Sequence, residues 1–175
     1  MTWPRRIAFA ALSGCLSVVV VSPVSGAGRT LVPCTGSMLE GTFKAVPNSP
    51  GAGNIVYRLR VTNTSNKGCF VTGIPRVTLL DKAGRKLPTN ARFGGKPGTL
   101  AAVVAPLAPG GAATLTARFS PDVPGTGEPV TKACEPTAYR LSVAPSGGGT
   151  AVVPVSPPTP VCEHGAMALT VFVTA

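Results

Sequence analysis

Hydrophobic and polar side chains alternate along several short stretches of the chain with the period of two that half-buried β-strands show. Residues 55–61 read IVYRLRV, with apolar or aromatic side chains at the odd positions and Arg58 and Arg60 between them. Residues 139–143, YRLSV, repeat this arrangement around Arg140. Both stretches therefore predict strands that bury one face and expose the other, as strands of antiparallel sheets do.

Turns rich in glycine, proline and asparagine separate further apolar runs, and no helical periodicity follows residue 27. The predicted strands are Met38–Val46, Ile55–Asn63, Cys69–Thr72, Val77–Leu80, Leu100–Val104, Ala112–Phe119, Ala138–Ala144, Thr150–Val155 and Ala168–Thr174. Residues 120–134 predict a long crossing loop, and residues 156–160, SPPTP, a stiff extended connector. This pattern predicts an all-β fold, an antiparallel two-sheet sandwich of about eight strands.

The first 27 of the 175 residues have the order of a secretory signal peptide. Arg5 and Arg6 precede an apolar run, Ile7–Val21, which is shorter than the roughly 18–20 residues that span a bilayer. Small residues predict cleavage after Ala27, which leaves residues 28–175 as a single domain. Since no later segment resembles a transmembrane helix, we expect a secreted protein.

Lipid anchoring is the alternative interpretation of this leader. Residues 12–15, LSGC, have the form of a lipobox, in which Cys15 would be lipidated and hold the protein at the outer face of the membrane. Only eight residues separate Arg6 from Cys15, and the chain stays apolar where an anchored protein has a polar tether. We therefore expect secretion and keep anchoring through Cys15 as the alternative.

Four cysteines remain outside the leader: Cys34, Cys69, Cys134 and Cys162. An even number of cysteines in a small exported domain predicts disulfides. If the first two predicted strands form one hairpin, and the two strands after Cys134 form another, the hairpins bring together Cys34 with Cys69 and Cys134 with Cys162. We predict these two bonds. The wide cysteine spacing does not fit a zinc site or a C-x-x-C redox motif.

Basic residues outnumber acidic ones by sixteen to six, and the formal charge of +10 falls to +8 without Arg5 and Arg6. The candidate polyanion-binding residues are Lys82, Arg85, Lys86, Arg92, Lys96, Arg58, Arg60 and Arg140. They predict a basic surface for an anionic envelope polymer, with a solvated hairpin as the alternative. Phe93 is the single aromatic residue in the 82–96 segment, too little stacking surface to predict specific nucleic-acid binding.

Residue types that carry catalysis are scarce in residues 28–175. His164 is the one histidine, and because no G-x-S-x-G motif is present we interpret it as an exposed turn residue. The six carboxylates show no spacing that predicts an acid–base pair, and Asp81 opens the turn DKAG. A copper(I) site from His164, Met38 and Met167 at one end of the sandwich is a weaker alternative. We expect no enzyme activity, no catalytic residue, no cofactor and no metal.

Several segments occur in the order seen in a known family: PCTGSML at 33–39, YRLRVTNTSNKGCFVTGIPRVTLLDKAGRKL at 57–87, LAPGGAATL at 107–115, CEPTAYRLSVAP at 134–145 and VCEHGAMALTV at 161–171. Together they resemble a four-cysteine domain of unknown function, family 4232, of exported proteins and lipoproteins from actinobacteria. The resemblance covers essentially all of residues 28–175. It implies an extracytoplasmic immunoglobulin-like sandwich with both disulfides, and it implies no activity.

These observations predict a secreted, non-enzymatic binding or envelope-interaction module with a basic surface. A protein-ligand module, such as an inhibitor or adhesin that uses the exposed loop at 120–134, is the alternative. An extracytoplasmic enzyme and a copper-binding protein are weaker alternatives.

Overall fold

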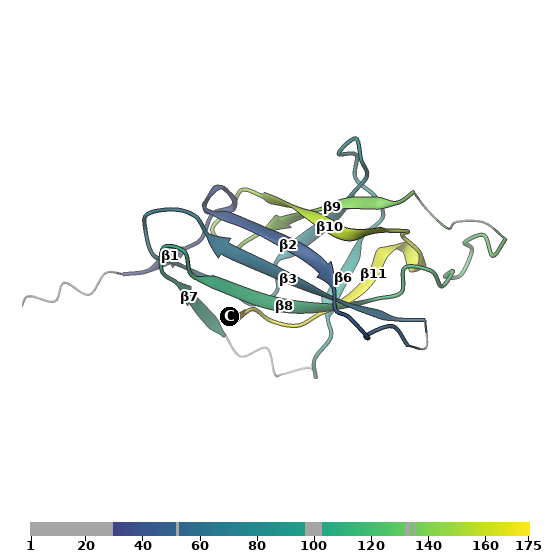
Figure 1. Cartoon of the computed structure of the whole chain (residues 1–175), viewed down its shortest axis with the longest axis horizontal. Coiled ribbons are helices and arrows are strands. Elements are labelled where there is room, and N and C mark those ends of the chain that lie inside the picture. The colour runs from purple at the N-terminus through teal and green to yellow at the C-terminus, as the bar shows by residue number, and fades with distance from the viewer. Residues whose placement is uncertain (1–29, 52, 97–102, 132–133, 135) are drawn as a thin grey trace, which may run out of the picture.

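The computed structural model describes residues 30–51, 53–96, 103–131, 134 and 136–175 (Figure 1). The predicted signal peptide, its cleavage site and Cys15 lie outside these residues, as does most of the strand predicted at 100–104. In the part of the chain that the structure describes, no helix has the length and apolar character needed to cross a membrane.

The described residues form twelve strands and two short 3-10 turns, η1 (Gly36–Met38) and η2 (Glu163–Gly165). The strands are β1 (Val32–Pro33), β2 (Leu39–Ala45), β3 (Ile55–Asn63), β4 (Cys69–Thr72), β5 (Arg76–Leu80), β6 (Asn90–Phe93), β7 (Val104–Leu107), β8 (Ala112–Phe119), β9 (Ala138–Ala144), β10 (Ala151–Thr159), β11 (Ala166–Leu169) and β12 (Val173–Thr174). The all-β prediction is confirmed.

Most of the strands belong to one curled sheet with the order β5-β9-β10-β2-β3-β8-β11-β6, and β12 also pairs with β8. Figure 1 shows β2, β3 and β8 side by side in one layer, with β9 and β10 beside β2. Inward side chains from both arms of this sheet, such as Leu59 and Leu115 on one and Leu141 and Val153 on the other, join a single buried cluster. A small sheet of β1, β4 and β7 adds Val71 and neighbouring residues to the same core.

The prediction of purely antiparallel pairing is wrong at three places. β10 pairs with β2 in parallel, with Val155 opposite Phe43. β11 is parallel to β6, and β1 is parallel to β4. Parallel neighbours are joined through long connections, so the alternation within each strand carried no information about these pairings.

The two predicted hairpins are confirmed, because β2 pairs with β3 and β9 pairs with β10, both antiparallel. Other boundaries differ from the prediction. Residues 156–159 form the second half of β10 rather than a connector, after a shift in its register with β9. The strand predicted at 168–174 is divided into β11 and β12, and β1 and β6 had not been predicted. Residues 120–131 contain no strand, in agreement with the predicted loop.

Both predicted disulfides are present among the described residues. Cys34 bonds to Cys69 with their Cα atoms 5.0 Å apart, and Cys134 bonds to Cys162 with their Cα atoms 5.2 Å apart. The first ties the chain before β2 to β4, and the second ties the chain before β9 to the chain after β10. Each bond therefore joins segments that flank one of the two confirmed hairpins.

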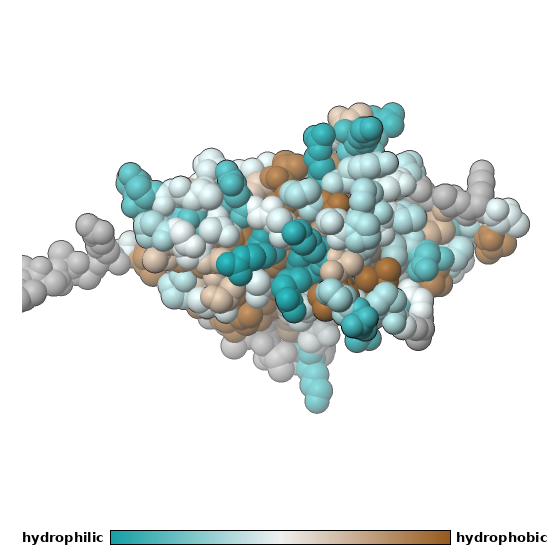
Figure 2. Space-filling view, viewed as in Figure 1, coloured by the Kyte–Doolittle hydropathy of each residue, from teal (hydrophilic) through white to brown (hydrophobic). Residues whose placement is uncertain are grey.

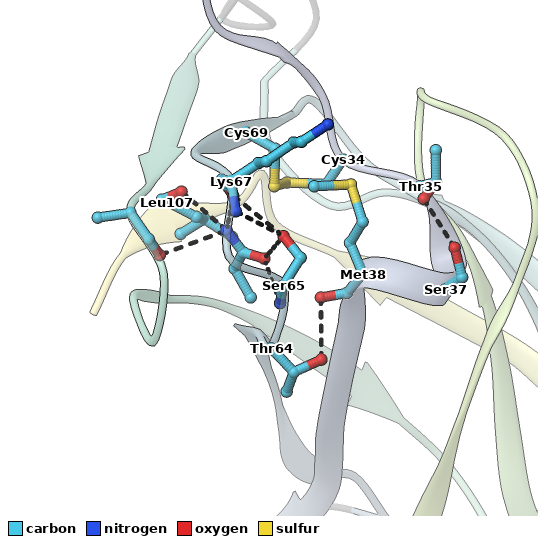
Figure 3. The surroundings of a disulfide bond; sticks show 11 residues. Cys34, Thr35, Ser37, Met38, Thr64, Ser65, Lys67, Cys69 and Leu107 are labelled. Carbon is cyan, nitrogen blue, oxygen red and sulfur yellow. Dashed lines mark hydrogen bonds between the residues drawn. A yellow bond between two sulfur atoms is a disulfide. The ribbon is translucent and has the colours of Figure 1, made fainter.

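Asn63, fully buried at the end of β3, organises the turn that leads to Cys69. Its Nδ2 donates to the carbonyl oxygens of Lys67 at 2.7 Å and Leu107 at 3.1 Å. Its Oδ1 accepts hydrogen bonds from the amide and the hydroxyl of Ser65, at 3.0 and 2.7 Å. Figure 3 shows Ser65, Lys67 and Leu107 gathered beside the Cys34–Cys69 bond. One neutral amide thus links the 63–68 turn and β7 at this end of the fold.

Candidate functional site

The structure divides the predicted basic residues into two groups. Lys82, Arg85 and Lys86 lie on the turn after β5, and the Nη2 of Arg140 on β9 donates to the carbonyl of Lys82 at 3.2 Å. Arg58 and Arg60 lie on β3, whereas Arg92 lies on β6 and Lys96 follows it. Because β9, β10 and β2 separate β5 from β3 in the sheet, the turn and β3 do not form one continuous basic surface.

Asp81 holds the turn group in place. Its buried carboxylate accepts hydrogen bonds from the Arg85 amide at 2.8 Å and from the Arg85 Nε at 2.6 Å. The side-chain hydrogen bond from Arg85 is the main cause that lowers the pKa of Asp81. The predicted turn role of Asp81 is therefore confirmed, and part of the positive charge of this group is neutralised locally.

The second group is larger than the sequence predicted. β2, β3, β8, β11 and β6 are consecutive in the sheet, and we call their outward side the basic face. Its exposed cations are Lys44, Arg58, Arg60, Arg92 and Arg118. Figure 2 shows hydrophilic side chains gathered over the layer formed by β2, β3 and β8. Threonines stand between the cations, since Arg60 is opposite Thr42 on one side and Thr114 on the other.

The cations of the basic face have few acidic neighbours. Arg58 on β3 is directly opposite Lys44 on β2, an arrangement that destabilises a sheet through like-charge repulsion. The ion pairs recorded between described residues are Arg85–Asp81 and His164–Glu128, and neither contains a cation of this face. Glu40 on β2 is the acidic residue that the described strands present beside these cations. The face therefore carries a clear excess of positive charge.

A groove runs along β11 at one margin of the basic face, and we call it the β11 groove. Its larger part, a hollow of about 540 Å³, is lined by Arg92 and Asn90 from β6, Arg118 from β8 and Ala168 from β11. A second hollow of about 400 Å³ shares Arg118 and Ala168 with the first. The two hollows therefore adjoin along β11, and together they make up the β11 groove.

The η2 turn lies beside the β11 groove, and Glu163 of this turn lines the groove. Glu163, His164 and Gly165 have φ values of 49°, 52° and 70°, a left-handed conformation that is unfavourable for the two non-glycine residues. The side chain of Glu128, 3% exposed, compensates for this. Its carboxylate accepts hydrogen bonds from the amides of Gly125, Glu163 and His164, each at 2.7 Å.

These contacts set the charge state of Glu128. The hydrogen bond from the Gly125 amide, together with those from His164 and Glu163, lowers the pKa of Glu128 below its usual value. The His164 Nδ1 lies 3.3 Å from Oε1 of the same carboxylate, and its Nε2 is 3.2 Å from the Thr126 carbonyl oxygen. His164 is exposed, which confirms its predicted place in a turn. Glu128 therefore ties residues 125–128 to η2 as an anion.

Metal coordination finds little support in this part of the fold. Ligand atoms of Glu128, Cys134 and Cys162 lie within 4.8 Å of one another, but the two cysteines form a disulfide and the carboxylate is occupied by amides. The proposed copper residues are not brought together. Met38 precedes β2 near Asn63, whereas Met167 pairs with Phe119 near Ile55, at the opposite end of β3.

Three residues of this region had not been singled out from the sequence: Lys44, Arg118 and Glu128. Lys44 and Arg118 were visible as polar residues at outward positions of alternating strands, but each is isolated in the sequence. Their proximity to Arg58 arises from strand pairing. Glu128 contacts residues 35 and 36 positions away, and the nearby Cys134–Cys162 bond is the sequence feature that brings those segments together.

Comparison with known proteins identifies a family but no activity. Residues 34–173 match a domain of unknown function (DUF4232). No curated protein and no solved structure gives a significant match to the chain. Because the matched region spans most of the chain and all of its disulfide-forming cysteines, the protein belongs to the family defined by this domain of unknown function.

Proposed function

We propose that the protein is an exported, non-enzymatic module that binds an anionic polymer of the cell envelope through its basic face. The observation that carries the proposal is the set of five exposed cations on neighbouring strands, with a lysine and an arginine directly opposite each other. Repulsion within this set has a cost in the free protein. An anionic ligand would relieve that repulsion on binding.

The residue types on the face suit phosphate or carboxylate groups. Arginine guanidinium groups form paired hydrogen bonds to such anions, and the intervening threonines add hydroxyl donors. Since the cations lie on neighbouring strands of a rigid sheet, little backbone conformational entropy is lost when they bind. The resemblance to exported proteins and the two disulfides support a location outside the cytoplasm.

A binding measurement with matched variants tests this proposal. The purified protein is passed over immobilised poly(glycerol phosphate), and its affinity is measured by biolayer interferometry at increasing salt. We expect Arg58→Gln/Arg60→Gln to weaken binding by about tenfold or more, and added salt to weaken binding by the wild type. Lys82→Gln/Lys86→Gln removes the same charge from the turn group and should change the affinity by less than about twofold.

Two results would contradict the proposal. The first is equal loss of affinity in both double variants, which would show that net charge rather than the basic face governs binding. The second is that the wild-type protein does not bind the polymer at low salt.

A protein partner is the second candidate, favoured by the loop at 120–131. Val130 is 83% exposed and Val123 is 38% exposed on this loop, so both aliphatic side chains are accessible to a partner. Glu128 anchors the loop between them, which would reduce the entropy lost on binding. Chemical cross-linking of the protein in culture fluid tests this idea. The idea fails if every captured protein is captured equally by the Val130→Asp variant.

We also propose that the fold is immunoglobulin-like. β2, β3 and β8 would take the places of strands A, B and E, and β5, β9 and β10 those of C, F and G. The insertion of β11 between β8 and β6 departs from the usual order. An experimental structure with β5, β9 and β10 outside one common sheet would contradict the assignment.

A further inference from the structure

The β11 groove exists because small side chains of one strand lie between long side chains of its neighbours. Ala168 on β11 is opposite Arg118 on β8 and opposite Arg92 on β6. Strands in a sheet are spaced by about 4.8 Å, so the two arginine Cα atoms stand roughly 10 Å apart across the alanine. An arginine side chain reaches more than half of that distance. The two guanidinium groups can therefore meet over the methyl group of Ala168.

The same arrangement continues toward both ends of β11. Two positions before Ala168 along β11, Ala166 is opposite Asn90. Beyond Ala168, the Thr170 hydroxyl accepts a hydrogen bond from the Thr116 amide. Gly94 borders this end, and a Cβ there would lie 2.9 Å from the Cβ of Ala168. Small residues thus form the floor of an elongated channel with polar walls.

The groups along the walls alternate in chemistry. Arg92 and Arg118 form a cationic centre, and the Nε of Arg92 donates to the Asn90 Oδ1 at 3.1 Å, which orients both side chains. In the larger hollow, the Ser120 hydroxyl donates to the Asn54 Oδ1 at 3.2 Å, and Glu163 contributes a carboxylate. Amide, hydroxyl and carboxylate groups beside the arginines suit the hydroxyls of a polyol or sugar.

We propose that the β11 groove binds one segment of a phosphodiester-linked polyol or sugar chain. A phosphate lies between Arg92 and Arg118, and the neighbouring hydroxyl-bearing unit contacts Asn90, Ser120 and Glu163. This inference rests on the proposed function, because the rest of the basic face holds the following phosphates by charge alone. The carboxylate of Glu163 disfavours a chain of directly linked phosphates, because such a chain would place a second anion beside it. The groove therefore selects a chain that alternates charge with hydroxyls.

The test separates selection in the groove from general charge attraction. Ala168→Leu fills the floor of the groove with an outward-facing side chain and leaves the charge unchanged. Ser142→Leu, a similar enlargement on the exposed side of β9, is the matched control. Binding of poly(glycerol phosphate) and of inorganic polyphosphate of equal total charge is measured by isothermal titration calorimetry, and thermal unfolding verifies that each variant is folded.

We expect Ala168→Leu to weaken poly(glycerol phosphate) binding by about tenfold while polyphosphate binding changes by less than about twofold. Arg92→Gln, which preserves the floor, should also weaken poly(glycerol phosphate) more than polyphosphate. Ser142→Leu should affect neither ligand.

The groove inference is overturned if Ala168→Leu leaves both affinities unchanged, or if it lowers both equally. In either case the proposed function stands as long as Arg58→Gln/Arg60→Gln still weakens binding. If the wild-type protein binds neither polymer, the proposed function itself fails.

Discussion

The two disulfide-bonded ends of the domain solve the same structural problem with different chemistry. Near Cys34–Cys69, the neutral amide of Asn63 connects its turn to β7. Near Cys134–Cys162, the carboxylate of Glu128 connects residues 125–128 to η2. In both cases one buried side chain forms hydrogen bonds to several backbone groups.

The two ends differ in the hydrogen bonds that their buried side chains can donate and accept. An amide both donates and accepts, so Asn63 bonds to carbonyls and amides and keeps its form at every pH. A carboxylate at neutral pH only accepts, which suits the converging amides of a left-handed turn. The Asn63 end is therefore insensitive to protonation, whereas the Glu128 end, which borders the β11 groove, is not.

Removal of either disulfide should have the largest effect on stability. The bonds close loops of 35 and 28 residues. Loop entropy then gives a loss of about 3.5–4 kcal/mol in the free energy of unfolding for each Cys→Ala pair. Denaturant titration of both variants measures it. If one pair costs less than about 1 kcal/mol, the two bonds are not equivalent clamps.

Asn63→Ala should rank next, with a loss of about 3 kcal/mol, because it removes the hydrogen-bond partner of the buried Leu107 carbonyl and of the Ser65 amide. Asn66→Ala in the same turn is the control, since this residue is exposed. We expect the control to change stability by less than about 0.5 kcal/mol. Equal losses of stability in the two variants would show that the Asn63 side chain does not specifically stabilise this turn.

Glu128→Gln should cause a smaller loss that is concentrated at the other end. The glutamine NH₂ group faces backbone amides that need an acceptor. We expect a modest decrease in melting temperature and faster hydrogen exchange at the amides of Gly125, Glu163 and His164. Glu40→Gln, on an exposed strand position, is the control. Unchanged exchange at those three amides would contradict the anchoring role of Glu128.

Acid pH should separate the two ends further. Because the pKa of Glu128 is lowered in the folded protein, its contribution to stability is complete above the unfolded-state pKa and is lost as pH falls through the folded-state pKa. The stability gap between wild type and Glu128→Gln should therefore narrow below about pH 4. The gap for Asn63→Ala should stay constant. Parallel pH dependence of the two gaps would refute the contrast.

The smallest effect should come from His164. Its side chain is 60% exposed, so His164→Ala should cost only about 0.5 kcal/mol through the lost contact with Glu128. At φ 52° glycine is free of the strain that alanine retains. His164→Gly should accordingly be more stable than His164→Ala in thermal melts, and the reverse order would show that the left-handed turn is not maintained.

Local patterns in the sequence predicted much of the fold. Alternation located β3 and β9, and the cysteines beside their hairpins were sufficient to predict both disulfides. The parallel contact between β10 and β2 joins residues more than one hundred positions apart, and alternation within a strand does not specify such partners.

The candidate site was harder to predict for the same reason. The basic run at 82–96 looks continuous in the sequence, but β5 and β6 lie at opposite ends of the strand order and divide it. Conversely, Lys44 and Arg118 are single cations that pairing brings beside Arg58 and Ala168. The alanines of β11 gave no signal, because a small residue becomes a groove floor only when its neighbours are known.

The position of β2 between β10 and β3 has a consequence for how the chain matures. A polypeptide that emerges with its amino end first cannot complete the hydrogen bonds of its earliest long strand until residue 156 has appeared. Until then, one edge of that strand is open to pairing with other chains. A chaperone that covers this edge while the chain emerges would raise the yield of folded protein without binding the folded domain.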